Sequence, residues 1–233
     1  MIPIKDDNPT RRFPLVTVAL LAVNIAVFAY EVSLTEAEFL ALLNRWAFVP
    51  ARLAADPSSP EVWLTLVTAM FVHGGWLHLG GNMLYLWIFG NNVEDRLGRV
   101  RFVVFYLAAG IAATLVHMLV EGPQDIPLVG ASGAIAGVLG AYLLLFPRAH
   151  VLVLIPIFFI IELARVPAAF VIGFWFLLQV LQGLGSITPG AAGGGIAWWA
   201  HVGGFVAGMA LVLPAYLSDR RSRRRSTRFT TWR

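Results

Sequence analysis

The sequence predicts an all-α integral membrane protein whose core is a bundle of six transmembrane helices with an interfacial first loop. Three features predict it: an apolar composition, six long apolar runs, and an uneven distribution of basic residues. Of the 233 residues, 58% are hydrophobic and 13% are charged, and the mean hydropathy is +0.76. Soluble domains average about 45–50% apolar and about 25% charged residues, so the composition indicates a protein that folds in lipid.

The first apolar run covers residues 13–32 and follows Arg11 and Arg12. It is longer than the 7–15 residues typical of a signal-peptide core, and no small-x-small cleavage site follows it cleanly, so we interpret it as a retained span. Residues 33–62 mix charged residues with leucine, tryptophan and phenylalanine. That mixture is typical of a partly helical loop at the membrane interface.

Five more apolar runs complete the predicted bundle, at residues 64–90, 102–120, 131–146, 167–185 and 196–217. Residues 151–161 are also apolar, but they are too short to cross a bilayer and contain Pro156, so we expect an interfacial or re-entrant segment there. Residues 13–217 would then form the membrane domain. Residues 1–12 and 218–233 would be tails.

The positions of lysine and arginine support an even number of spans. With six spans, 15 of the 17 basic residues lie on the side of the two termini, and only Arg45 and Arg52 lie opposite. Because basic residues favour the cytoplasmic side of a membrane, both termini are predicted to be cytoplasmic. The arginine-rich tail could also bind nucleic acid, but attraction to anionic headgroups beside the membrane is the simpler interpretation. We therefore expect no nucleic-acid partner.

Ionisable side chains are costly in lipid, so those in or near the predicted spans are candidates for chemistry. The groups that we expect could meet Ser132 are His73, His78, Asn82, His117 and His201. Acidic residues are absent from the span centres, which argues against a carboxylate proton relay and removes the aspartate of a Ser-His-Asp triad. The chain has no cysteine, so thiolate chemistry is excluded.

Two spans carry a polar residue at the head of a face of small residues. The two faces are Ser132, Ala136 and Gly140 on one span, and His201, Gly204 and Gly208 on the other. Small faces allow membrane helices to approach closely, so we expect these spans to pack through Gly133, Gly137, Gly140, Gly204 and Gly208. Such packing would bring Ser132 and His201 together near the non-cytoplasmic end. Taken singly, a serine in a membrane helix more often hydrogen-bonds a carbonyl of its own helix than acts as a nucleophile. A lone histidine is likewise more often a packing residue than a base.

Three motifs in order, "HLGGN", "GASG" and "AHVGGFVAG", lie on the second, fourth and sixth predicted spans. Together with "FVHGG" and "EDRLG", they resemble the rhomboid family of intramembrane serine proteases, over residues 63–208. The resemblance implies that Ser132 is the nucleophile and that His201 is its general base and later its acid. It also implies that His78 and Asn82 stabilise the oxyanion, that His73 supports the loop, and that no cofactor is needed.

The sequence departs from the family pattern at two places. Many members have an aromatic residue four positions after the nucleophile, where it packs on the catalytic histidine, but this chain has Ala136. Trp198 or Trp199 is then expected to orient His201, unless both simply lie in the interfacial belt. The Trp-Arg pair of the first loop is also missing, since Leu64 follows Trp63.

Rival chemistries find less support in the residues. A zinc site built from His73, His78 and His201 would lack both an HExxH motif and an acidic ligand. A transporter would need charged or ion-binding residues at the midplane, and a pseudoprotease would have lost the serine or the histidine.

The expected substrates are single-span membrane proteins with helix-breaking residues near the non-cytoplasmic end, because a helical peptide bond must unwind before it can be attacked. The glycine-rich segment 183–195 is either a mobile lid or an ordinary connection. We expect a multi-pass protein of a prokaryotic plasma membrane, and the sequence leaves its oligomeric state open.

Overall fold

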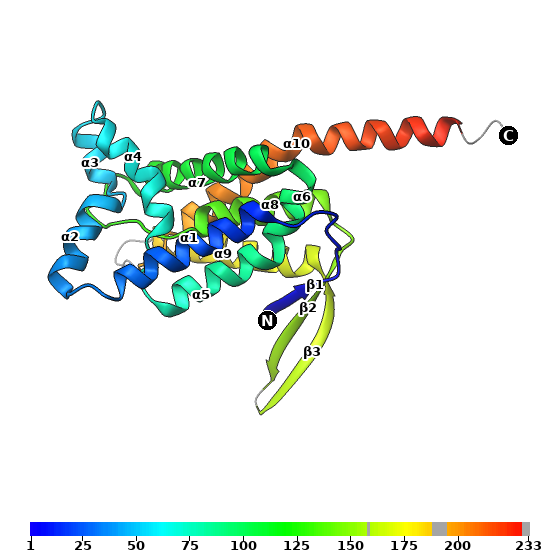
Figure 1. The fold of residues 1–233 in the computed structure, drawn as a ribbon, viewed down its shortest axis with the longest axis horizontal. Helices are drawn as coiled ribbons and strands as arrows, with labels where there is room; N and C mark the ends of the chain where they lie inside the picture. The colour runs from blue at the N-terminus through cyan, green and yellow to red at the C-terminus, as the bar shows by residue number, and fades with distance from the viewer. Residues whose placement is uncertain (158, 188–194, 230–233) are drawn as a thin grey trace.

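Helices make up most of the computed structural model, which describes residues 1–157, 159–187 and 195–229. The helices are α1 (Leu15–Glu31), α2 (Glu36–Trp46), α3 (Pro50–Ala55), α4 (Pro60–Thr68), α5 (Trp76–Tyr85), α6 (Asn91–Leu97), α7 (Arg99–Glu121), α8 (Ser132–Leu145), α9 (Ala168–Ser186) and α10 (Trp198–Phe229). A 3₁₀ turn, η1 (Ala69–Phe71), follows α4, and a π-helical turn, η2 (Leu86–Gly90), joins α5 to α6. Figure 1 shows the longer helices side by side, with α2–α4 at one end of the bundle and a small sheet at the other.

Among the described residues, three helices are long and apolar enough to cross a membrane: α7, α9 and the first 21 residues of α10, Trp198–Ser218. Two more are apolar but shorter, α1 with 17 residues and α8 with 14. Since a helix rises about 1.5 Å per residue, α8 is about 21 Å long, which is less than the hydrocarbon core of about 30 Å. The count of six spans is therefore not confirmed by helix length and stays a prediction.

The predicted second span, residues 64–90, is not one continuous helix. The segment Pro60–Phe71 and the segment Trp76–Leu97 are bent by 83° at the short break between them. Gly75 at the break has φ 153°, a backbone conformation that side-chain-bearing residues rarely adopt. The helix that begins afresh at Trp76 carries the "HLGGN" motif, whereas α4 belongs with the first loop.

The prediction of an all-α protein is wrong in one region, where a three-stranded antiparallel sheet has the order β1-β2-β3. The strands are β1 (Ile2–Asp6), β2 (His150–Ile157) and β3 (Ile160–Pro167). Residues 151–161, expected as an interfacial or re-entrant piece, thus belong mostly to a β-hairpin, as suits a run of β-branched residues. Pro156 lies beyond the part of β2 that pairs with β1, at an edge position that tolerates proline.

The N-terminal residues, expected as a tail, are held to the bundle by this sheet. Asp6 is buried and accepts a hydrogen bond of 2.7 Å from the hydroxyl of Tyr142 in α8. The backbone N–H of Asp7 donates to the carbonyl of His150 at 3.0 Å. Burial raises the pKa of the Asp6 carboxyl above its ordinary value of 3.8, and the hydrogen bond from Tyr142 opposes that shift.

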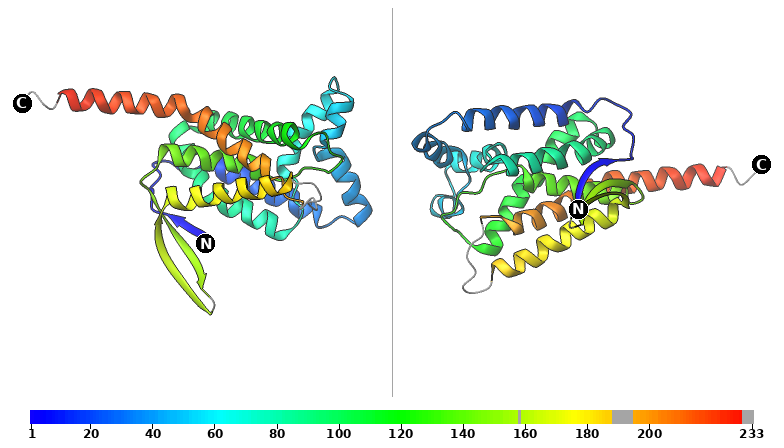
Figure 2. Two further views of the ribbon diagram at one scale, coloured as in Figure 1. Left: turned by 180° about the vertical axis from the view of Figure 1, so that it is seen from behind. Right: turned by 90° about the horizontal axis from the view of Figure 1, so that it is seen from below.

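Helix α8 lies at the centre of the bundle, packed against α7 and α10. All residues from Ala134 to Tyr142 are buried. The two views of Figure 2 show α10 passing beside α8 and continuing past the end of the bundle. Because α8 is covered by its neighbours, little of it would face lipid.

The first loop, residues 33–62, was expected to be partly helical. It forms α2, α3 and the start of α4. Helix α2 begins with a capping box in which Thr35 and Glu38 bond each other's backbone N–H groups, which satisfies donors that a helix start leaves free. Phe48 pairs with Leu128 through two backbone hydrogen bonds of 3.1 and 2.7 Å. The loop is thereby tied to the segment that leads into α8.

Candidate active site

Ser132 is the first residue of α8, and the backbone before it is fixed by a glycine. Gly130 has φ 113°, and its N–H donates to the carbonyl of Ala69 at 2.8 Å. A Cβ at position 130 would lie 2.5 Å from Nε2 of His78 and 3.7 Å from Nδ2 of Asn82. Glycine therefore allows two polar side chains of α5 to approach the turn that carries Ser132.

The hydroxyl of Ser132 meets the ring of His201. Oγ of Ser132 lies 2.8 Å from Nε2 of His201, and Nδ1 of the same ring lies 2.7 Å from Oε1 of Gln179 in α9. With Nδ1 carrying the proton, the ring donates to the Gln179 amide oxygen, and its free Nε2 accepts from the serine hydroxyl. This tautomer suits a base that removes the proton of Ser132.

Gln179 is itself held in place. It is buried, with 6% of its surface exposed, and its Nε2 donates to the carbonyl of Trp175 at 3.1 Å. This residue was not among those predicted from the sequence. The run 167–185 contains two glutamines, and only the spatial arrangement separates Gln179 from Gln182, which is exposed.

Aromatic rings border His201 on two sides. The ring of Trp175 lies 5.8 Å from the imidazole, at 38° between the planes, and the ring of Trp198 lies 6.2 Å away at 86°. Trp198 was one of two expected neighbours of His201, whereas Trp199 instead donates from Nε1 to the carbonyl of Gly183 at 2.9 Å. Ala136 is fully buried, and Trp175, which the sequence did not single out, provides a ring close to the histidine.

His78 and Asn82 lie one turn apart in α5, on the side that faces Gly130. Asn82 is 7% exposed, and its Nδ2 lies 3.0 Å from Nε2 of His73. His73 is almost fully buried, its Nδ1 lies 3.3 Å from the carbonyl of Phe71, and its backbone N–H donates to both carboxylate oxygens of Glu31 at 3.2 Å. His73 thus supports Asn82 and the break before α5.

The small faces of α8 and α10 meet backbone to backbone. A Cβ at Gly204 or Gly208 would collide with the carbonyl oxygens of Gly133 and Gly137, and a Cβ at Gly140 would collide with the carbonyl of Phe205. Gly133 and Gly137 also face α7, because a Cβ at either would lie 2.7 or 2.6 Å from Ala113 or Ala109. This close approach determines how near His201 comes to Ser132.

Within residues 1–157, 159–187 and 195–229, no group of three or more histidine, cysteine, aspartate or glutamate side chains is arranged to hold a metal ion. His117, in α7, has its Nδ1 4.0 Å from the Glu121 carboxylate. Most of the segment considered as a lid, residues 188–194, lies outside the described residues.

A partly buried serine–histidine pair at the head of an apolar helix, bordered by a histidine and an asparagine, is the arrangement that the motifs suggested. A family model, "Rhomboid domain", matches residues 60–217. The chain belongs to the rhomboid family. The protein is embedded in a membrane, as rhomboid proteins are.

Curated rhomboid relatives come from eukaryotes and bacteria. The chain is similar to "Rhomboid protein 1, mitochondrial" of Saccharomyces cerevisiae, with 29% identity over 204 residues, 82% of this chain and 50% of the yeast protein. It is 38% identical over 81 residues to "Putative rhomboid protease YdcA" of Bacillus subtilis, 35% of this chain and 40% of that protein. "Rhomboid protease GluP" of the same bacterium is 43% identical over 81 residues, 35% of this chain and 15% of its own length.

The chain spans half or less of the length of each of these three rhomboid relatives. A mitochondrial rhomboid protein stands among them, so the expected location in a prokaryotic plasma membrane is not supported. The rhomboid family includes intramembrane proteases as well as members without protease activity. Whether this chain is a protease therefore depends on the residues of its own candidate site.

Proposed function

We propose that this chain is an intramembrane serine endopeptidase that cleaves membrane-protein substrates with Ser132 and His201. The observation that supports this most directly is the chain of contacts from Gln179 through both nitrogens of His201 to the hydroxyl of Ser132. A member that only bound clients would have no need of an oriented base beside a serine.

In the proposed reaction, Oγ of Ser132 attacks the scissile carbonyl carbon while its proton passes to Nε2 of His201. The tetrahedral intermediate collapses when His201 returns that proton to the leaving nitrogen, which breaks the C–N bond and leaves an ester on Ser132. Water, deprotonated by His201, then attacks the ester. The acid product leaves, and the proton returns to Oγ of Ser132.

The negative charge on the carbonyl oxygen needs donors during both steps. The side chains of His78 and Asn82 approach the turn at Gly130 from α5, and the N–H of Ser132 belongs to the first turn of α8, where amides have no partner within the helix. We assign the oxyanion site to these three groups. His73, by accepting from Nδ2 of Asn82, would hold that amide in place before substrate arrives.

Gln179 acts in this proposal as a positioning residue for His201. Its amide takes the place that an aspartate has in a soluble triad, fixing the ring through Nδ1. Because the amide is neutral, it orients the ring without adding a charge that would be costly to bury in a membrane. Trp175 and Trp198 border the same ring.

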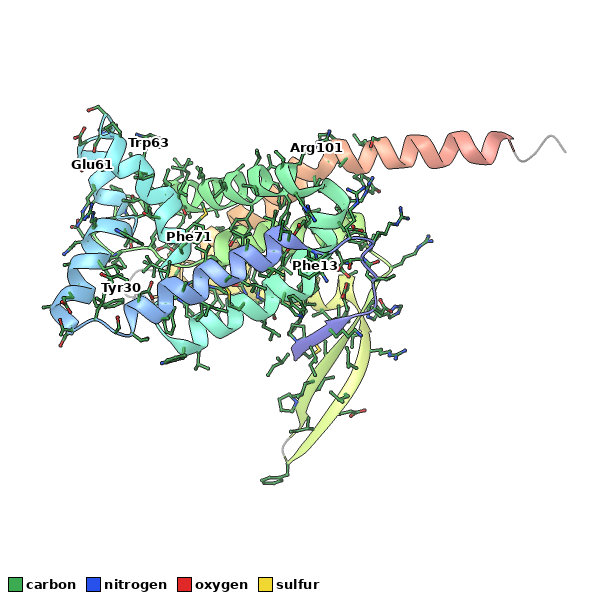
Figure 3. The ribbon with its side chains drawn as sticks, viewed as in Figure 1. Phe13, Tyr30, Glu61, Trp63, Phe71 and Arg101 are labelled. Atoms are coloured by element: carbon green, nitrogen blue, oxygen red, sulfur yellow. The ribbon has the colours of Figure 1, made fainter. Side chains whose placement is uncertain are left out.

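We further propose that six segments cross or enter the membrane, with both termini in the cytoplasm. The segments are α1, α5 with α6, α7, α8, α9 and the start of α10. Figure 3 shows Arg101 and Phe13 toward the sheet end of the bundle, and Glu61 and Trp63 at the opposite end. The preference of arginine for the cytoplasmic side would then place the sheet in the cytoplasm and the first loop outside.

The proposed substrates are single-span membrane proteins with helix-breaking residues near the outer side of the membrane. A peptide bond within a helix is shielded by its hydrogen bonds, so segments that unwind readily are the ones Ser132 would reach. Residues 13–217 would be the protease unit.

The test is cleavage of a purified single-span reporter by the full chain in liposomes. We expect the wild type to cut, Ser132→Ala and His201→Ala to fall to background, and Ser58→Ala, at an exposed serine of the first loop, to retain the wild-type rate. If folded wild type and Ser132→Ala are equally inactive across several reporters, the chain binds clients without cutting them.

A further inference from the structure

The β2–β3 hairpin joins the end of α8 to the start of α9. In the proposed topology, it lies where the bundle leaves the cytoplasmic side of the bilayer. Figure 1 shows that it does not extend outward along the helix axes. It runs across them, and the far ends of β2 and β3 lie to the side of the bundle. The view from behind in Figure 2 shows the same direction. In the proposed topology, this direction runs along the membrane surface.

The two faces of the hairpin differ in what they contact. In an antiparallel pair, residues that lie opposite each other share a face. Val151 and Val153, opposite Val166 and Ala164, are fully buried in the main hydrophobic core. This inner face holds the base of the hairpin on the bundle.

The outer face is apolar and uncovered by the described chain. It carries Leu154 opposite Leu163, and Pro156 opposite Ile161, while Ile2 of β1 lies on the other side of Leu154. Ile161 is 67% exposed, Leu163 58% and Ile2 50%, and Phe159 at the turn is fully exposed. A contiguous patch of exposed apolar side chains of this kind is unfavourable in water.

Basic residues stand on the same outer face, nearer its base. Lys5 and Arg165 both pair with Leu152, and both are exposed. The face is therefore apolar toward the turn and positively charged toward the bundle end. This is the distribution found in elements that lie in a membrane interface, where basic groups meet lipid phosphates and apolar groups reach the acyl chains.

We propose that the outer face of the β2–β3 hairpin, with Ile2 of β1, docks into the lipid interface as a membrane anchor beside the bundle. The apolar side chains of Phe159, Ile161 and Leu163 enter the boundary between headgroups and acyl chains. Lys5 and Arg165 bind headgroup phosphates. This inference rests on the proposed membrane topology and not on the proposed proteolysis.

Backbone chemistry limits the depth of insertion. Within the described residues, β3 pairs only with β2, and β1 covers β2 only from Val151 to Leu154. The remaining edge N–H and C=O groups need water or headgroup partners, which the hydrocarbon core lacks. The anchor therefore lies at the interface and does not span.

The absence of cysteine in the chain makes a labelling experiment direct. Single-cysteine proteins Ile161→Cys and Leu163→Cys are labelled with an environment-sensitive fluorophore in liposomes, and Arg148→Cys, in the exposed turn after α8, is the matched control. Quenching by iodide in water is compared with quenching by lipids that carry a nitroxide just below the headgroup. Thermal unfolding of each labelled protein verifies its fold.

Labels at 161 and 163 are expected to emit at shorter wavelength than the label at 148, to lose emission to the lipid quencher, and to resist iodide. The proposal is overturned if iodide quenches 161 and 163 as strongly as 148. It is also overturned if their protection disappears when the protein is diluted into excess lipid, because a second copy of the chain would then cover the face.

Discussion

The amide oxygen of Gln179 lies 2.7 Å from Nδ1 of His201, across the imidazole ring from Ser132. This contact comes from α9, and it gives the histidine a partner that Ala136, within the nucleophile's own helix, does not provide.

Gln179→Met should lower kcat and leave KM nearly unchanged. Methionine fills the same volume without accepting from Nδ1, so His201 loses one hydrogen bond of about 1–3 kcal/mol, which corresponds to roughly 5- to 150-fold in rate. Gln179→Glu keeps an oxygen acceptor and should retain more activity than Gln179→Met. Steady-state kinetics on a single-span reporter measure both. Equal losses in the two variants would mean that Gln179 serves packing alone.

Asn82→Ala should reduce kcat by about 10²–10³, the usual cost of removing one oxyanion donor. His73→Phe keeps a buried ring but removes the Nε2 acceptor of Asn82, so a smaller fall in kcat is expected. Single-turnover rates, with thermal unfolding to monitor the fold, distinguish loss of the donor from loss of structure. Unchanged rates in Asn82→Ala would remove this residue from the oxyanion site.

Gly208→Ala should destabilise the bundle by about 1–3 kcal/mol, a typical cost of overpacking. Its Cβ would meet the carbonyl of Gly137 and push α10 away from α8. Gly173→Ala in α9 is the control, since a Cβ there meets no atom within 4 Å. Thermal unfolding in detergent measures the difference, and similar midpoints for the two variants would contradict the packing described for α8 and α10.

Asp6 should make stability depend on pH. Its pKa is raised by burial in the folded protein, so the folded state holds the proton to a higher pH than the unfolded chain does. Stability should therefore fall as pH rises from about 4 through the raised pKa, and stay lower above it. Unfolding midpoints between pH 4 and 7 measure this, and Asp6→Asn should lack that decline.

Two further variants separate the charge of Asp6 from its hydrogen bond. Asp6→Leu leaves the Tyr142 hydroxyl without its acceptor and should be less stable than Asp6→Asn at every pH, by about 1–3 kcal/mol. Asp125→Asn, at an exposed loop carboxylate, should keep the wild-type dependence on pH. If the unfolding midpoints of the wild type and of Asp6→Asn change with pH in the same way, Asp6 is not the cause of the pH dependence.

Family membership and the apolar helices were predictable because hydropathy and motif order are local properties of a sequence. The sheet was not, since β1 pairs with residues about 150 positions away, and an apolar β-branched run resembles a membrane segment by composition alone. The bend before α5 was not predicted from the sequence either, for a similar reason. Hydropathy across residues 64–90 does not reveal that Gly75 has a positive φ.

The meeting of Ser132 and His201 followed from small-residue faces, because faces of glycine and alanine indicate which helices approach closely. Gln179 and Trp175 could not be found in that way. Their approach to His201 depends on the rotation of α9 about its axis, and both of its glutamines looked alike in sequence. His73 was expected to support the loop, but its hydrogen bond with Asn82 depends on how the chain folds back at the break before α5.

The most direct measurement of the central claim is labelling of the full chain in liposomes with a fluorophosphonate, which reacts with an activated serine whatever the natural substrate. Peptide mass spectrometry then identifies the modified residue. We predict a single adduct on Ser132 that is lost in His201→Ala and slower to form in Gln179→Met. An intact wild type that gives no adduct, or one that reacts equally well without His201, would contradict the assignment of Ser132 and His201 as the catalytic pair.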